Sequence, residues 1–111
     1  MLYFDFEAGN KAYKLRLNTR STVKLEEALG CNPLSIFGDG DTIPPVTVMV
    51  RILHASLQAL EHGITLEKAY DIFDAYLEDG HSVTDFISVI LEIYKVSGII
   101  RDNSQENTEK N

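Results

Sequence analysis

The sequence has few of the features that mark secreted, membrane-spanning or nucleic-acid-binding proteins. Cys31 is the only cysteine, so no internal disulfide can form, and we expect a reducing, cytosolic environment. No apolar run approaches the ~18 residues of a membrane span, and the N-terminus has no basic segment followed by an apolar stretch. We therefore expect neither a membrane anchor nor a signal peptide.

Basic residues are also few. Ten Lys and Arg stand against 17 Asp and Glu, which gives a formal net charge of −7. Five of these bases lie within residues 1–24, so the rest of the chain is strongly acidic. Because binding to nucleic acid or anionic lipid needs clustered Lys and Arg, we expect neither as a partner.

Motifs for catalysis or metal binding are missing too. His54 and His62 are too far apart on one expected helix to share a zinc ion, and no second Cys or His stands at ligand spacing. The segment 38–41 resembles the start of a calcium loop, but the glutamate needed at the twelfth position is replaced by Val50. No phosphate-binding loop or nucleophile elbow is present. We predict a protein that is not an enzyme and that uses no metal or cofactor.

Two alternating segments at the N-terminus predict a β-hairpin. Residues 2–7 and 11–17 alternate between apolar and polar, and the intervening Ala8-Gly9-Asn10 is typical of a turn. Two strands alone are marginally stable in water, so the hairpin must pack on helices or extend a partner's sheet.

Capping residues and helical periodicity predict four helices after the hairpin. They cover about residues 23–29, 46–62, 66–79 and 83–97, with a loop over 32–45. Thr65 is the expected cap of the third helix, and Ser82 with Asp85 has capping-box spacing before the fourth. The expected fold is α+β, an N-terminal β-hairpin packed on a bundle of about four helices. One domain spans residues 1–98, and a flexible, disordered polar C-terminal tail spans 99–111.

The helices over 46–62 and 83–97 carry more apolar circumference than a single small domain needs. The polar residues of the first fall in one narrow arc: Thr47, Arg51, His54, Gln58 and Glu61. On the second, apolar side chains spread over about 220°, although a ~100° stripe suffices for packing. Either the fourth helix is threaded between the second helix and the hairpin, or its excess faces another subunit or a client. The partner-binding residues that we predict are Tyr70, Tyr76, Phe86, Ile90, Ile93 and Tyr94.

A helix-turn-helix reading of the third and fourth helices finds little support. A recognition helix presents Arg, Lys, Asn or Gln near its start, whereas this one offers Thr84 and Asp85. Its only base is Lys95. DNA binding is therefore not expected.

The order of these segments resembles the tail assembly chaperones of long-tailed bacteriophages. The similarity lies in the strand Tyr13-Lys14-Leu15-Arg16-Leu17, the helix Leu25-Glu26-Glu27-Ala28-Leu29 with Gly30, and Gly80-His81-Ser82 before the last helix. The resemblance covers residues 3–98. It implies a chaperone that coats the tape measure protein and delivers it to the tail tube protein, in the cytoplasm of the bacterial host and not in the mature virion. It also implies a second, longer form made by a minus-one frameshift.

A different use of the same apolar excess gives the alternative. A homo-oligomeric structural or adaptor protein of a phage tail or connector would use it for permanent self-assembly. Homo-oligomer formation is expected under both readings.

Overall fold

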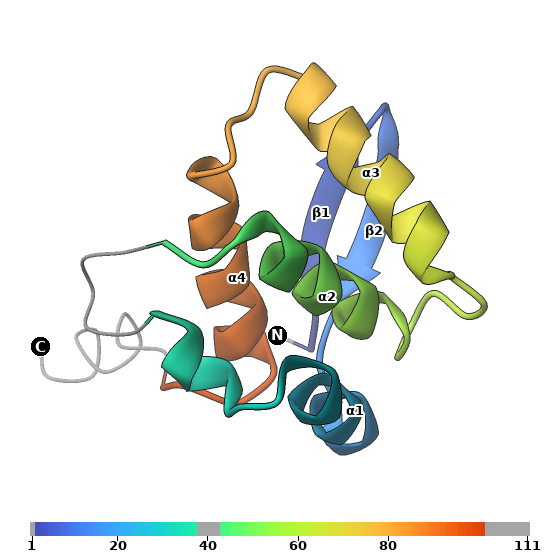
Figure 1. Ribbon diagram of the computed structural model, residues 1–111. Helices are drawn as coiled ribbons and strands as arrows, with labels where there is room; N and C mark the ends of the chain where they lie inside the picture. Colours follow the sequence, from blue (N-terminus) through green and yellow to red (C-terminus); the bar gives the residue numbers. More distant parts are fainter. Residues whose placement is uncertain (1, 38–42, 102–111) are drawn as a thin grey trace, which may run out of the picture.

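The computed structural model describes residues 2–37 and 43–101 and has an α+β fold, which confirms the predicted class (Figure 1). A hairpin of two strands is followed by four α-helices and one short 3₁₀-helix. The elements are β1 (Phe4–Ala8), β2 (Lys11–Leu15), α1 (Thr19–Leu29), η1 (Pro33–Phe37), α2 (Val46–Leu57), α3 (Leu66–Glu78) and α4 (Asp85–Val96). Most of the predicted tail, residues 102–111, lies outside the described residues.

The hairpin is closed by a two-residue turn. Gly9 and Asn10 both have positive φ, 60° and 65°, which is the backbone that a type I′ turn requires. This turn fixes an antiparallel register that runs from Ala8 opposite Lys11 to Phe4 opposite Leu15. The backbone N–H of Gly9 donates to the Asp79 carboxylate at 2.8 Å, so the tip of the hairpin is attached to the end of α3.

Helix α1 begins four residues earlier than predicted, because Asn18 forms a complete capping box. The Asn18 side chain accepts from the Ser21 N–H at 2.9 Å, and the Ser21 hydroxyl accepts from the Asn18 N–H at 2.9 Å. Both free donors at the helix start are thereby satisfied. Gly30, with φ of 73°, ends the helix as expected.

Helix α2 ends at Leu57, so the prediction that it continues to His62 is wrong. The side-chain amide of Gln58 donates to the carbonyls of both His54 and Ile64, each at 2.9 Å. The Glu61 carboxylate accepts from the Lys14 N–H of β2 at 2.9 Å. These bonds fold residues 58–64 back onto the end of the helix, and a continuing helix could not make them.

The cap predicted for α3 is present, whereas the pair predicted to cap α4 forms a turn before that helix. The Thr65 hydroxyl accepts from the Lys68 N–H at 3.1 Å at the start of α3. Ser82 and Asp85 exchange two bonds, from the Ser82 N–H to the carboxylate and from the Asp85 N–H to the hydroxyl. This pair closes a turn ahead of α4, which starts at Asp85 and not at Val83 as predicted.

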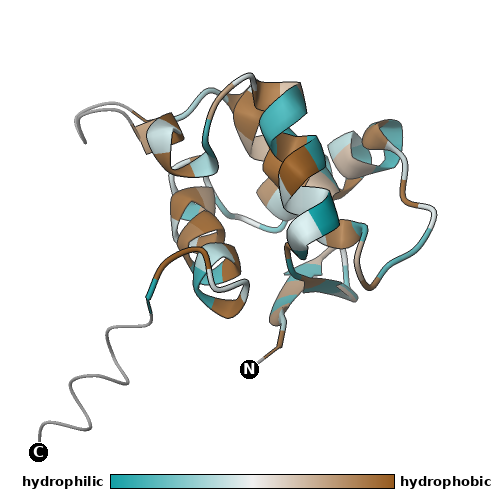
Figure 2. Cartoon of the chain, turned by 90° about the horizontal axis from the view of Figure 1, so that it is seen from below, coloured by the Kyte–Doolittle hydropathy of each residue, from teal (hydrophilic) through white to brown (hydrophobic). Residues whose placement is uncertain are grey.

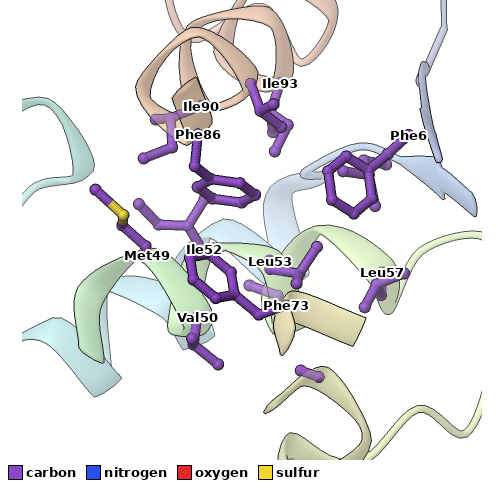
Figure 3. Close-up of a cluster of buried hydrophobic side chains, with 14 of the residues drawn as sticks. Phe6, Met49, Val50, Ile52, Leu53, Leu57, Phe73, Phe86, Ile90 and Ile93 are labelled. Carbon is purple, nitrogen blue, oxygen red and sulfur yellow. The ribbon is translucent and has the colours of Figure 1, made fainter. Parts of the chain in front are cut away.

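Helix α2 is the central element of the core, as its apolar sequence predicts. It contacts α1, α3, α4 and β2, while α3 and α4 also contact β1. Figure 3 shows side chains of α2, α3, α4 and the hairpin meeting in one buried cluster. Two additions to the prediction are η1, which lies within the expected loop, and Ile99 and Ile100, which pack half-buried against the core beyond the predicted domain end. No helix among the described residues is long and apolar enough to span a membrane.

Candidate functional site

Five of the six predicted partner-binding residues lie in the hydrophobic core. Phe86, Ile90, Ile93 and Tyr94 are fully buried, and Tyr76 is only 5% exposed. In Figure 3, Phe86, Ile90 and Ile93 point from α4 toward α2 and the hairpin. None of the five forms a surface that a partner could contact in this conformation.

The apolar side chains that cover most of the circumference of α4 pack against other elements of the same molecule. The helix packs against α2 and β1, and the ring of Tyr94 reaches η1, where Phe37 lies edge-on at 6.4 Å between ring centroids. The open alternative, a fourth helix threaded between α2 and the hairpin, is therefore what the structure contains. The other alternative, an apolar excess of α4 that faces a partner, is not what the structure contains; Leu91, 38% exposed, is the one large exposed apolar side chain of this helix.

Tyr70 is the exposed member of the predicted set. It is 43% exposed on α3, and Leu66 and Leu77 lie half-buried on the same side of that helix, four residues before and seven after it. We call Leu66, Tyr70 and Leu77 the α3 stripe. An exposed acidic row runs beside it at the same helical spacing, formed by Glu67, Asp71, Asp74 and Glu78.

A groove with the opposite charge lies between α1 and α2. Its volume is about 300 Å³. Small apolar side chains and Leu25 form part of it, and three residues of the polar arc predicted on the second helix also line it, Arg51, His54 and Gln58. We call it the basic groove; its lining residues are Asn18, Arg20, Ser21, Lys24, Leu25, Ala28, Arg51, His54, Ala55, Gln58 and Ala59.

The basic groove is a local reversal of the protein's charge. Among the described residues, none of its lining side chains is acidic, and Arg20, Lys24 and Arg51 form no ion pair within that part of the chain. Helix α1 also has no acidic residue in its first turn, so the positive end of its dipole adds to these cations. The arrangement attracts carboxylates or other anions.

His54 is the titratable group at the α2 side of the groove. Its Nε2 atom lies 3.1 Å from the Ile64 carbonyl oxygen and therefore donates to it. Burial is the main cause that lowers the pKa of His54 below 6.5, and the positive charge of Arg51 lowers it further. The other polar groups are engaged in structure, because Ser21 caps α1 and Gln58 holds Ile64. The described residues of the groove therefore offer positive charge and include no activated nucleophile.

The α1 cations were missed as site residues because they lie in a different element from the polar arc of α2. The sequence contained one signal for each wall of the groove. The concentration of bases within residues 1–24 pointed to the α1 side, and the narrow polar arc that includes Arg51 and His54 pointed to the α2 side. What the sequence did not supply was the pairing of α1 with α2, which brings these two signals together.

Metal and thiol chemistry receive no support from the described residues. No three His, Cys, Asp or Glu side chains gather there in a way that could hold a metal ion. Cys31 is exposed and makes no disulfide.

Comparison with known proteins gives one match. Residues 5–111 match a family described as a family of unknown function, DUF6096. No curated protein and no solved structure matches the chain.

Proposed function

The chain belongs to the family of unknown function DUF6096, and we propose that it is a phage tail assembly chaperone that holds the helical tape measure protein and assists assembly of the tail tube. The observation that carries the proposal is the α3 stripe. Its exposed centre, Tyr70, is flanked by an acidic row on a helix that otherwise packs well.

The spacing of the stripe suits a helical client. Leu66, Tyr70 and Leu77 recur at intervals of four and seven residues, which is the pattern by which one helix packs along another. An amphipathic client helix can lay its apolar face on such a row. Tyrosine is also a frequent anchor at protein interfaces, because its ring is apolar and its hydroxyl tolerates water.

The acidic row beside the stripe predicts a second property of the client helix, which is a basic edge. Glu67, Asp71, Asp74 and Glu78 lie exposed beside the stripe, so a client helix with Lys or Arg along one edge binds better than an acidic one. The same charges keep the complex soluble while apolar surface is covered. Reversible holding needs both features, a small apolar contact and a charged border.

The test is site-specific photo-crosslinking to the tape measure protein encoded in the same genome. A photoreactive phenylalanine analogue at position 70 should trap the tape measure protein during co-expression. The same analogue at position 91 is the matched control, because Leu91, 38% exposed against 43% for Tyr70, is of similar accessibility but lies on α4. Equal trapping at the two positions, or none at position 70, would refute the proposal.

A permanent homo-oligomeric adaptor of a tail or connector is the second candidate. The opposite charges of the α3 stripe's border and the basic groove favour self-association. Light scattering with and without a tape measure fragment separates the two, because a chaperone should exchange self-association for client binding, whereas an adaptor should stay assembled.

A further inference from the structure

The cations of the basic groove form no ion pair within the described part of the chain. Three cations of a protein with a net charge of −7 line it, while their nearest acidic neighbours in α1, Glu26 and Glu27, do not. Arg20, Lys24 and Arg51 are exposed and repel one another, so an anionic occupant would be stabilised at this groove.

We propose that the basic groove binds the α3 stripe of a second copy of this chain, so that copies associate head to tail. The groove needs an occupant with apolar side chains for its alanines and Leu25 and carboxylates for its cationic border. The α3 surface offers both, with Tyr70 at its centre and Asp71 and Asp74 next to it.

The size and shape of the groove favour a helix side over a small molecule. About 300 Å³ is the lower end of the range for ligand pockets, and this groove is an open depression between two helices. Part of its lining consists of short side chains, which leave room for side chains that project from another helix; these are Ala28, Ala55 and Ala59. A helix that lies across α1 and α2 would place its carboxylates against Arg20, Lys24 and Arg51.

The position of the two surfaces prevents the contact within one copy. Figure 1 shows α1 and α3 on different sides of α2, and both helices pack against that central helix. The groove and the stripe of one molecule therefore face different directions. A contact between unlike surfaces is heterologous, and it continues from copy to copy into a ring or an open filament.

This inference goes beyond the proposed client binding but uses the same stripe. A stripe that is seated in a neighbour's groove is hidden, so free chaperone would protect its apolar surface until a client displaces the neighbour. The groove itself is not needed for the client. The two ideas can therefore fail separately.

The test is a charge-reversal complementation measured by light scattering coupled to size-exclusion chromatography. The wild-type chain should show a mass that rises with concentration. Arg51→Glu and Asp74→Lys should each weaken the association by at least ~10-fold, because a like charge then faces the remaining ones. A 1:1 mixture of the two variants should associate again, since the intact groove of one meets the intact stripe of the other.

Two exposed charge reversals on the hairpin serve as controls, because the hairpin contributes no residue to the basic groove or to the α3 stripe. Lys11→Glu and Glu7→Lys change the net charge by the same amounts as the test variants and should associate as the wild type does. Thermal unfolding of all four variants checks that each is folded. If the wild type stays monomeric up to millimolar concentration, or if the mixture fails to recover association, the inference is overturned.

Binding of the client is measured with the same variants. Arg51→Glu should keep full crosslinking from position 70 to the tape measure protein, because its stripe is intact. Crosslinking from a wild-type chain that stays monomeric refutes only the head-to-tail contact. Wild-type self-association that Arg51→Glu weakens, with no crosslinking from position 70, refutes only the client proposal.

Discussion

The hydroxyl of Tyr94 donates a hydrogen bond of 2.9 Å to the carbonyl oxygen of Pro33, which lies in η1. Tyr94 is fully buried, and burial raises the pKa of its phenol far above the ordinary value, so the group keeps its proton. The bond joins the last helix to the segment after α1. It therefore fixes the position of two elements that are remote in sequence.

Removing this hydroxyl should destabilise the fold without creating a cavity. Tyr94→Phe leaves the Pro33 carbonyl without its partner, and a buried unpaired acceptor costs about 1–3 kcal/mol. Urea unfolding monitored by circular dichroism measures the change. Tyr70→Phe is the matched control, because Tyr70 is 43% exposed and its hydroxyl can bond to water, so its unfolding free energy should stay the same. Equal effects of the two substitutions would contradict the assignment.

Phe86 and Leu91 should behave as core and surface residues of the same helix. Phe86 is fully buried and its ring packs edge-on against Phe73 with 5.0 Å between centroids. Phe86→Ala should lower the free energy of unfolding by about 3–5 kcal/mol, whereas Leu91→Ala should change it by about 0.5 kcal/mol. Denaturant titration of both variants checks this. A small effect at Phe86 would mean that α4 is less tightly packed in solution than in the structure.

The sequence predicted the local features of the fold because their causes are local. Alternation predicted the hairpin, Thr65 predicted the start of α3, and Gly30 predicted the end of α1. Each of these signals depends on residues within a few positions of one another. The structure confirms them with the expected hydrogen bonds.

The features that the sequence did not predict depend on contacts between residues that are distant in the chain. The end of α2 is set partly by the bond between Glu61 and β2, and η1 is held by Tyr94. Apolar circumference alone could not tell that α4 is covered on several sides, because the covering elements come from all parts of the chain. For the same reason, the basic groove became visible only when α1 and α2 were placed together.

A side chain at Gly9 should destabilise the fold. Its φ of 60° is strained for any residue with a Cβ, and an added Cβ would lie 3.2 Å from the Ala75 side chain. Gly9→Ala should therefore lower the free energy of unfolding by at least ~1 kcal/mol. Gly63→Ala is the control for the backbone effect alone, since it has a φ of 80° but nothing within 4 Å of the added atom. Thermal unfolding should show the larger loss at Gly9, and an equal loss would exclude a contribution from the Ala75 contact.

The titration of His54 should report the positive potential of the basic groove. Burial and the charge of Arg51 lower the pKa of His54 below 6.5, while Arg20 and Lys24 line the groove from α1. The folded state therefore resists protonation more than the unfolded chain, so stability is full above pH 6.5 and falls as the pH drops toward the folded pKa.

Two measurements check the sign. The pKa of His54 from an NMR titration at low protein concentration should lie below 6.5 and should rise in Arg51→Gln, which removes a like charge. The unfolding free energy of His54→Gln should fall less than that of the wild type between pH 7 and pH 5. A His54 pKa above 6.5 at low concentration would mean that the hydrogen bond to the Ile64 carbonyl outweighs burial and the charge of Arg51. At high concentration the head-to-tail contact brings carboxylates to the groove, so the pKa should then increase with association, and Asp74→Lys should abolish that increase.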